Sequence, residues 1–348
     1  MATERLISPA ALAPEEEQIN WSLRPTRIQD YVGQADLIER LKIAMQAGKA
    51  RADPMEHVLL HGPPGLGKTT FATVLPNELG TTIQMTSGPA LSKPSDLLPF
   101  LTNAEDGSVL FIDEIHRMPR VVEEFIYPAM EDFRVDIVLG EGVNARTISL
   151  TLKHFTLIGA TTRSGMLSGP MRDRFKMHEH LEFYSIEDLA TIVRINAGKL
   201  GTEISDDACH ELATRSRGTP RIANSRLWWV RNYAASEADG RISLAIAREA
   251  LDMAEVDREG LDKQDRRYLE TLVGVFDGGP TGVEAIAATM NLPSETLSDE
   301  VEPYLLREQF IIRTSRGRVA MPKTFELLGK PQKRKSGDGP SLFEPQGD

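Results

Sequence analysis

Residues 62–69 carry a pattern that can bind the phosphates of a nucleoside triphosphate. The stretch reads GPPGLGKT and matches G-x-x-x-x-G-K-T. Its glycines let backbone N–H groups turn toward phosphate oxygens, and a helix starting there adds the positive end of its dipole. Lys68 is expected to contact the β- and γ-phosphates, and the Thr69 hydroxyl to ligate Mg²⁺. An apolar run at 58–60 precedes the motif and a helix-compatible run at 71–75 follows it, so an ordinary Gly/Pro turn is the weaker interpretation.

A second group of residues could activate water. Residues 108–114 predict a buried strand that ends in two carboxylates. We expect Asp113 to hold Mg²⁺ through its water shell, and Glu114 to orient and deprotonate the attacking water. A strand with a merely polar end is the alternative, but the phosphate motif upstream favours the catalytic interpretation. Another apolar strand, at 155–162, ends in Thr162, whose hydroxyl is expected to bond the γ-phosphate or the attacking water.

Alternating strands and helices must position these groups. Strands are predicted at 58–60, 83–85, 108–114 and 155–162, and helices at 36–49 and 97–101. Such units predict an α/β fold with a doubly wound parallel sheet and the nucleotide at its carboxyl edge. Residues 136–139 and 145–150 flank Gly140-Glu-Gly142 and predict a β-hairpin.

The remaining chain predicts further domains. Apolar residues recur at helical spacing after residue 183, and three helices followed by a short hairpin give the outline of a winged helix at the C-terminus. The expected division is a flexible leader at 1–18, an ATPase domain at 19–184, a small helical domain at 185–257, a winged-helix domain at 258–330 and a disordered tail at 331–348.

Composition limits the function classes. The chain has 348 residues, 41% of them hydrophobic, and a net charge of −11. No apolar run is long enough to span a membrane and no signal pattern opens the chain, so a cytoplasmic location is expected. Cys209 is the single cysteine, which excludes an internal disulfide and a cysteine-based zinc site. Any contact with DNA must come from a local basic patch.

The wing of the C-terminal domain is such a patch. Arg313, Arg316 and Arg318 surround its turn, whereas the helix that would enter a major groove is acidic. The acidic residues of that helix are Glu295, Asp299, Glu300 and Glu302. Base readout by this helix is therefore not expected, and the wing is expected to contact the DNA backbone without regard to sequence. The alternative is an arginine-rich turn that only keeps the protein soluble.

The order and spacing of these motifs resemble the RuvB family, AAA+ ATPase motors that drive branch migration of Holliday junctions. The resemblance covers residues 23–329. It is carried by 62–69 (GPPGLGKT), 86–89 (TSGP), 111–117 (FIDEIHR), 127–133 (YPAMEDF), 157–163 (LIGATTR), 217–223 (RGTPRIA) and 302–305 (EPYL). It implies an ATP-dependent DNA translocase in recombination, DNA repair and the SOS response to DNA damage, with ATP and Mg²⁺ as cofactors.

The resemblance also implies roles for single positions. Leu23, Arg24 and Tyr184 would border the adenine. Thr162 would be the first nucleotide sensor, and Arg221 the second. The phosphates would be held by Gly62, Gly65, Gly67, Lys68, Thr69 and Thr70. Three consecutive residues align with a family segment near the nucleotide: Glu131, Asp132 and Phe133.

Arg174 resembles the arginine finger of the family. A finger that stabilises transition-state charge in trans must come from a neighbouring subunit, so the active enzyme is expected to be a ring, hexameric by the resemblance. Arg172 is the alternative finger, and only the family pattern favours Arg174.

The family further implies a protein partner, RuvA, which recognises the junction and docks on a projecting hairpin, with the RuvC resolvase in the wider complex. In this chain the candidates for docking are Ile148 and Leu150, which share one face of a strand. Docking requires both side chains to be exposed in the isolated subunit. The alternative is that they pack under their own sheet.

Some positions depart from the family pattern. Lys176 stands where glycine is usual, Ser315 replaces a proline of the wing, and residues 227–230 (LWWV) replace an arginine-rich helix face. Trp228 and Trp229 could form a stacking site for bases, but we expect them to pack against a neighbouring domain.

Two other function classes are compatible with parts of the sequence. An ATP-gated protein remodeller or scaffold would use the winged domain to bind protein, and nothing in the ATPase core separates it from a DNA motor. A small-molecule kinase is disfavoured, because no acceptor pocket or lid is apparent and a finger arginine implies a ring.

Overall fold

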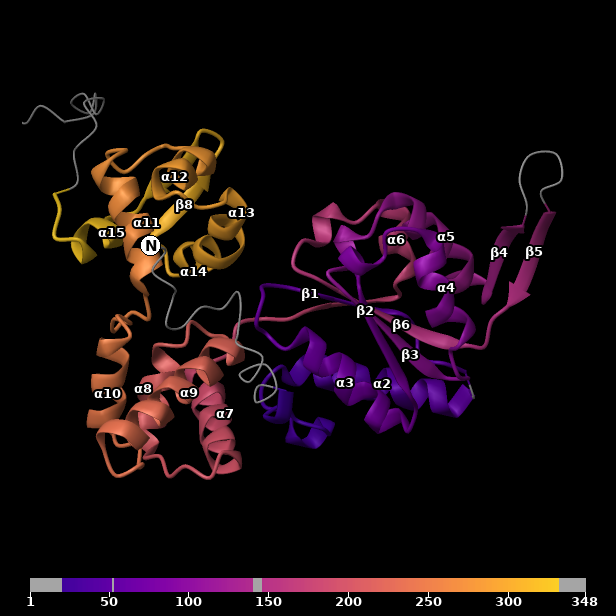
Figure 1. Cartoon of the computed structure of the whole chain (residues 1–348), viewed down its shortest axis with the longest axis horizontal. Helices are drawn as coiled ribbons and strands as arrows, with labels where there is room; N and C mark the ends of the chain where they lie inside the picture. Colours follow the sequence, from indigo (N-terminus) through magenta and orange to yellow (C-terminus); the bar gives the residue numbers. More distant parts are fainter. Residues whose placement is uncertain (1–20, 52, 140–145, 332–348) are drawn as a thin grey trace, which may run out of the picture. The chain divides into compact units, whose positions relative to one another are not determined.

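The computed structural model describes residues 21–51, 53–139 and 146–331 (Figure 1). The chain divides into two compact units, with the boundary between Ala254 and Glu255. The predicted leader at 1–18 and all but residue 331 of the predicted tail lie outside the described residues. No helix in the described ranges is long and apolar enough to cross a bilayer.

A parallel five-stranded sheet in the order β2-β3-β6-β1-β7 forms the centre of the first unit. Its strands are β1 (Val58–His61), β2 (Ile83–Ser87), β3 (Ser108–Asp113), β6 (Phe155–Thr161) and β7 (Met177–His180). Strand β6 lies between β1, which precedes the phosphate motif, and β3, which carries the acids. Every residue of β6 is buried, as expected for a central parallel strand covered on both faces. The predicted doubly wound α/β fold is confirmed.

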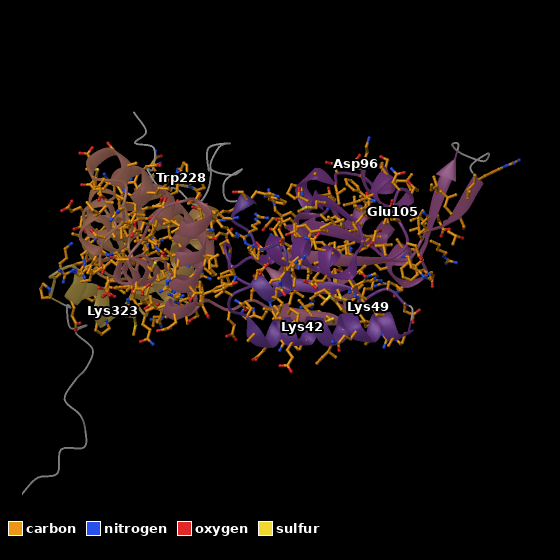
Figure 2. All side chains as sticks on the ribbon, turned by 90° about the horizontal axis from the view of Figure 1, so that it is seen from below. Lys42, Lys49, Asp96, Glu105, Trp228 and Lys323 are labelled. Carbon is orange, nitrogen blue, oxygen red and sulfur yellow. The ribbon has the colours of Figure 1, made fainter. Side chains whose placement is uncertain are left out.

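Helices cover both faces of this sheet, with α2 and α3 on one side and α4, α5 and α6 on the other (Figure 1). These helices are α2 (Ala35–Arg51), α3 (Lys68–Leu79), α4 (Pro94–Thr102), α5 (Arg120–Glu131) and α6 (Gly169–Arg174). Short 3₁₀ turns occur at η1 (Ile28–Asp30), η2 (Gly88–Ala90), η3 (Ile115–Arg117) and η5 (Ser164–Met166). On α2, Leu37 and Leu41 are buried while Lys42 and Lys49 project outward (Figure 2). One helix face therefore supplies core and the other meets water.

A separate two-stranded ribbon projects from this domain (Figure 1). It consists of β4 (Arg134–Leu139) and β5 (Arg146–Thr151), which pair antiparallel from Arg134–Thr151 to Leu139–Arg146. The predicted hairpin is confirmed and begins two residues earlier than expected. Its predicted turn at 140–142 lies outside the described residues.

The small helical domain contains α7 (Ile186–Lys199), α8 (Asp206–Thr214), α9 (Pro220–Glu237) and α10 (Leu244–Met253). Serine side chains accept backbone N–H bonds at three of the four N-termini, at Ser185, Ser205 and Ser243. The Trp229 indole N–H donates to the Ala250 carbonyl at 2.6 Å, so this ring packs within its own helical domain. The expectation that it faces a neighbouring domain is wrong for Trp229.

The second unit is a winged helix. Its elements are α11 (Lys263–Gly274), α12 (Val283–Met290), α13 (Ser294–Thr296), the π-turn η6 (Leu297–Val301), α14 (Glu302–Arg307), β8 (Ile311–Thr314), β9 (Gly317–Ala320) and α15 (Pro322–Leu327). Strands β8 and β9 pair antiparallel and form the wing. Its core includes the fully buried Leu269, Leu272, Leu305 and Phe310.

Candidate functional site

The phosphate loop connects β1 to α3 in a conformation that requires glycine. Gly62, Gly65 and Gly67 have φ angles of 140°, 80° and 97°. A Cβ atom at Gly62 would lie 2.6 Å from the Leu181 carbonyl oxygen, and one at Gly67 would lie 2.6 Å from the Tyr31 hydroxyl. The loop therefore follows a path open to glycine alone and leads its backbone into the N-terminus of α3, as phosphate binding requires.

Lys68 is buried at the start of α3 and points back across the loop. Its ammonium donates to the carbonyl oxygens of Gly62 and Pro63, each at 2.8 Å. Burial lowers the pKa of Lys68 to about 8, against the opposing effect of Asp113 and Glu114. Burial therefore disfavours the charged form of this amine, and a phosphate beside it would favour that form.

Nucleotide binding should therefore change the protonation of Lys68. Phosphate oxygens favour the ammonium form and raise its pKa, so at pH 8 binding of ATP should take up about half a proton. ATP affinity should fall as the pH rises above 8, because each binding event then requires more proton uptake. At pH 6 the amine is charged both before and after binding, so proton uptake by Lys68 should vanish. Calorimetry in two buffers of different ionisation enthalpy measures the proton count.

The matched control is Lys68→Arg, whose guanidinium stays charged at all these pH values and should remove this uptake. Proton release by the wild type at pH 8, or equal uptake by both proteins, would contradict the assignment of Lys68.

Thr69 and Asp113 meet as the sequence predicted. The Thr69 hydroxyl donates to Asp113 Oδ2 at 3.3 Å, although 44 residues separate them. Asp113 Oδ1 accepts the N–H of Glu114 at 2.9 Å, which fixes the carboxylate plane. A hydroxyl and a carboxylate at a carboxyl sheet edge are the hard oxygen ligands that Mg²⁺ prefers, so the residues fit this ion.

Glu114 follows β3 in the left-handed backbone region, with φ 47°, and its side chain is 36% exposed. Its Oε2 atom lies 3.4 Å from His116 Nε2, and His116 Nδ1 lies 2.8 Å from Thr161 Oγ1. A chain of polar groups therefore connects the proposed base to the end of β6, one residue before Thr162. Sequence reasoning missed His116 and Thr161, since a histidine two residues past an acid is not specific by itself.

Two arginines supply cations beside this carboxyl edge. The backbone N–H of Arg221, from α9, donates to the Gly65 carbonyl at 3.3 Å. Burial, and then the Arg221 guanidinium, lower the pKa of Arg24. Arg24 Nη1 is buried without a hydrogen-bond partner among the described residues. A buried unsatisfied donor beside a second guanidinium fits a site that receives an anion such as a triphosphate.

Leu23 and two tyrosines lie beside the phosphate loop. Leu23 and Tyr184 are buried, and the Tyr184 hydroxyl donates to the Tyr31 hydroxyl at 3.0 Å. Tyr31 stacks on Phe71 of α3 with ring centroids 4.1 Å apart. Tyr184 also donates its N–H to the Gly218 carbonyl, which ties this wall to the helical domain. Tyr31 was not predicted as a site residue, because a lone tyrosine before a glycine carries little signal.

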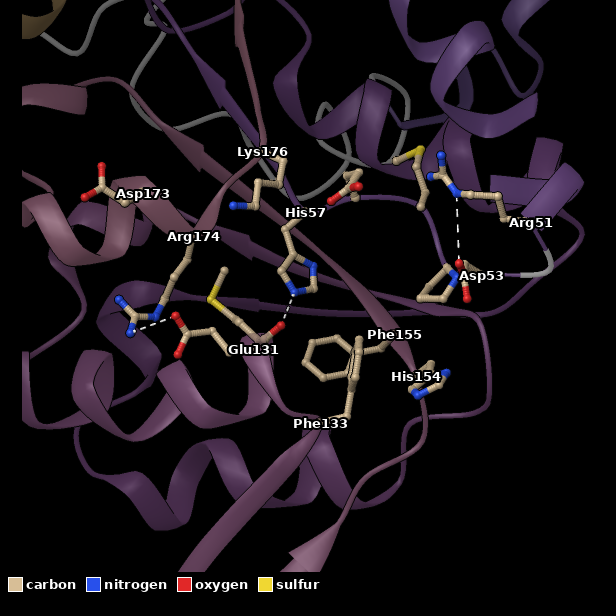
Figure 3. Close-up of a pocket in the computed structure, with 14 residues that line it drawn as sticks. Arg51, Asp53, His57, Glu131, Phe133, His154, Phe155, Asp173, Arg174 and Lys176 are labelled. Carbon is tan, nitrogen blue, oxygen red and sulfur yellow. Dashed lines mark hydrogen bonds and ion pairs between the residues drawn. The ribbon is translucent and has the colours of Figure 1, made fainter. Parts of the chain in front are cut away.

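Arg174 lies at the opposite edge of the sheet from the phosphate loop. It lines a cavity of about 500 Å³ together with His57, which precedes β1, whereas the loop follows β1 (Figure 3). Its guanidinium forms an ion pair with Glu131 at 3.1 Å and lies 3.9 Å from the Tyr127 ring centroid. Arg172 is exposed and does not line this cavity. The structure therefore places Arg174, and not Arg172, in this cavity.

Glu131 and Phe133 also line this cavity, and Asp132 lies exposed between them. The structure does not bring these three residues to the phosphate loop of their own chain. A role near a nucleotide therefore requires the nucleotide of a neighbouring subunit.

The ribbon exposes the two predicted docking residues. Ile148 and Leu150 have 44% and 37% of their surfaces exposed, and they pair with Ile137 and Val135 of β4. The alternative, in which both side chains pack under their own sheet, is not observed.

The wing differs from the sequence expectation. Arg313 and Arg318 both form ion pairs with Glu302, at 2.5 Å and 2.9 Å, and Glu302 is fully buried. Arg316 is exposed at the turn. The three arginines are therefore not equivalent surface cations, a difference that one sequence without contacts could not reveal.

Comparisons with known proteins cover nearly all of these elements. Three family models match in order: "Holliday junction DNA helicase RuvB P-loop domain" at 23–181, "RuvB AAA lid domain" at 184–257 and "RuvB C-terminal winged helix domain" at 258–329. The "Holliday junction branch migration complex subunit RuvB" of Rhodopirellula baltica is 59% identical over 307 residues, which is 88% of this chain and 84% of that protein.

Solved structures agree with this similarity. A Thermotoga maritima RuvB described as a Holliday junction branch migration motor matches with a TM-score of 0.80 at 42% identity, covering 89% of this chain and 99% of the other. A point mutant of the same Thermotoga maritima protein matches with a TM-score of 0.82 over the same shares of the two chains.

Proposed function

Because this chain belongs to the RuvB family, we infer that it is the ATP-hydrolysing motor subunit of a Holliday junction branch migration complex. The observation that carries this inference is the convergence of Lys68, Thr69, Asp113 and Glu114 at one sheet edge, in a chain that also has the lid and the winged domain of the family.

We propose the following division of labour at the nucleotide. The loop N–H groups and Lys68 bind the phosphates, and Arg24 and Arg221 add charge from the two sides. Leu23 and Tyr184 border the base. Glu114 takes a proton from the attacking water, and Thr162 bonds the γ-phosphate or that water.

Thr69 and Asp113 are proposed to hold Mg²⁺, the Asp113 carboxylate through water. When bound, the ion would neutralise charge that develops on the phosphates. The residue set supports this assignment through its oxygen ligands and the 3.3 Å contact between them.

Arg174 is proposed to act in trans. Its position at the edge opposite the phosphate loop, next to Glu131 and Phe133, suits a face that meets the nucleotide of the next subunit. Repetition of such a head-to-tail contact closes a ring, and we propose from the family resemblance that this ring is a hexamer. The domain limits proposed from the sequence, 19–184, 185–257 and 258–330, remain the working division of each subunit. A cytoplasmic location is proposed with them.

The winged domain is proposed to contact the arms of a four-way DNA junction through its wing. Its helix region around Glu295 and Asp299 is acidic and would repel phosphates, so readout of bases by that helix is not expected. Sequence-independent contact suits a motor that must move along any sequence.

A motor without base readout needs a protein that brings it to the junction. We propose that RuvA does so by covering Ile148 and Leu150, and that RuvC acts in the wider complex. The support is the exposed apolar pair on a projecting ribbon, which is an unfavourable surface for an isolated protein.

Ile148→Asp with Leu150→Asp should abolish RuvA-dependent branch migration. Two carboxylates on this face would have to be desolvated in the complex, which is costly without partner cations. Both side chains are exposed, so the unfolding temperature and unstimulated ATPase should change little. Gel analysis of junction products with RuvA present measures the effect.

Thr147→Asp is the matched control, because it adds one charge to the opposite face of β5. Normal migration by the double mutant would remove the ribbon from the mechanism, and an unfolded double mutant would indicate that the pair has a packing role.

The proposed function as a whole is tested by the ATPase rate with and without four-way DNA. Stimulation by four-way DNA above the basal rate is expected. Indifference to DNA together with stimulation by a protein ligand would favour a protein remodeller.

A further inference from the structure

One buried carboxylate connects both strands of the wing to the helix behind it. Glu302, the first residue of α14, is 0% exposed. Its Oε2 accepts Nε and Nη2 of Arg313, at 2.9 Å and 2.5 Å. Its Oε1 accepts Arg318 Nε at 2.9 Å, and Oε2 also accepts Arg318 Nη2 at 3.2 Å. Arg313 belongs to β8 and Arg318 to β9, so a single side chain holds the wing from both strands.

A neutral donor completes the shell of this carboxylate. The Tyr268 hydroxyl, from α11, donates to Glu302 Oε1 at 2.8 Å. Burial, followed by the adjacent Glu302 charge, raises the pKa of Tyr268 far above its ordinary value. Tyr268 therefore remains a neutral donor and adds no charge. The cluster contains two guanidinium groups and one carboxylate, which leaves one net positive charge.

The two guanidiniums differ in their access to solvent. The side chain of Arg313 is 47% exposed and that of Arg318 only 19%. The backbone of Arg318 is also fixed, because it exchanges two hydrogen bonds with Thr281, at 2.7 Å and 3.0 Å. Arg318 is thus anchored through both its main chain and its side chain.

Arg316 has none of these constraints. It is exposed at the turn, and in the part of the chain that the structure describes its side chain forms no ion pair. Its backbone N–H donates to the Thr314 hydroxyl at 3.3 Å, and this bond leaves the guanidinium unconstrained. Its charge is fully available to a phosphate.

We propose that Glu302 is a positioning residue that divides the wing arginines, making Arg318 a structural cation and leaving Arg316 and the exposed part of Arg313 to contact DNA phosphates. This inference rests on the proposed DNA-binding function. Arg313 binds Glu302 with Nε and Nη2, and the fork geometry of a guanidinium leaves the Nη1 donors for a second acceptor. The wing then makes two phosphate contacts rather than three, in an orientation set by the core of its domain.

Salt dependence counts these contacts. Each phosphate contact contributes about −0.9 to the slope of log affinity against log salt concentration on duplex DNA. The magnitude of that slope is the salt slope. Arg316→Ala should therefore lower the salt slope by about 0.9 for each wing that touches the duplex, without changing the unfolding temperature. Arg318→Ala should lower the unfolding temperature of the winged domain by several degrees and leave the slope within a few tenths of the wild type. Fluorescence anisotropy of a labelled duplex with the full-length protein gives the slopes.

A second-site variant separates charge division from simple packing. In the Arg316→Ala background, Glu302→Gln removes the compensating charge but keeps a side chain of the same shape that still accepts hydrogen bonds. Restoration of about 0.9 to the slope is expected, because a guanidinium released from its ion pair becomes available to phosphate. If Glu302 only packs the domain, the salt slope of the Arg316→Ala protein should not be restored by Glu302→Gln.

The proposal is overturned if Arg318→Ala lowers the salt slope by about 0.9 at an unchanged unfolding temperature. It is also overturned if Arg316→Ala leaves the salt slope unaltered. If Glu302→Gln does not fold, these two single variants still test the proposal. A wild type that binds duplex DNA without salt dependence would instead overturn the proposed DNA-binding function itself.

Discussion

Replacing Arg174 by alanine should lower ATP turnover by about 10³-fold or more, the scale of a lost arginine finger, while ATP affinity changes little. Arg174 lies at the sheet edge opposite its own phosphate loop, and we propose that it serves the nucleotide of a neighbouring chain. Glu131 and the Tyr127 ring hold its guanidinium in place. Steady-state ATPase assays and nucleotide titrations give the two quantities.

Arg172→Ala is the matched control, because it removes an exposed arginine two residues earlier on α6. Its turnover should stay within a few-fold of the wild type. Equal losses in both variants would mean that a general change in this helix, rather than a finger, causes the effect.

Mixed rings test whether Arg174 acts in trans. A chain with Lys68→Ala lacks nucleotide binding but keeps its finger, and a chain with Arg174→Ala has the reverse defect. Where the two kinds of chain are neighbours, an intact phosphate loop of one meets an intact arginine finger of the other. The ATP turnover of the mixture should therefore exceed that of either mutant alone. If mixed rings form and no mixture exceeds either parent, the trans assignment fails.

Glu114→Gln should give a protein that binds ATP and retains it unhydrolysed. The amide keeps the shape of the side chain but cannot accept a proton from water, and loss of a general base lowers rates by about 10²–10⁴-fold. The backbone contact between Glu114 and Asp113 does not involve the side chain that changes, so the Thr69–Asp113 pair should persist. Single-turnover hydrolysis and the nucleotide recovered from the purified protein measure the effect.

Glu124→Gln is the control, since Glu124 is an exposed glutamate of α5 paired with Arg120 on the same helix. It should hydrolyse ATP at the wild-type rate. Near-normal turnover by Glu114→Gln would place the catalytic base elsewhere, and loss of ATP binding would point to damage to the loop.

Much of the fold follows from local sequence. The apolar runs that become β1, β3 and β6 are continuous because central parallel strands are buried on both faces. The edge strand β7 has no apolar run, and its sequence MHEH alternates in exposure, so only the solvated strand edge at His178 and His180 could be predicted there. Thr69 and Asp113 were predicted to meet because the carboxyl ends of parallel strands share one edge of a sheet.

The contacts that the sequence did not reveal join residues distant in the chain. Arg313 and Arg318 look like surface cations until Glu302 is placed beside them, and the Trp229 indole reaches Ala250 of another helix. The connection from Thr161 through His116 to Glu114 likewise depends on where η3 lies against β6. Such pairings are set by tertiary packing, and residue type and local periodicity carry no information about them.

The central claim, that this chain converts ATP hydrolysis into movement of a DNA junction, is tested most directly by branch migration itself. A synthetic four-way junction with labelled arms is incubated with the full-length protein, RuvA and Mg²⁺, and its conversion to duplex products is followed. Conversion is predicted with ATP, and none with a non-hydrolysable analogue or with Glu114→Gln. Equal conversion with ATP and with the analogue, or none in the presence of robust junction-stimulated ATPase, would contradict the claim.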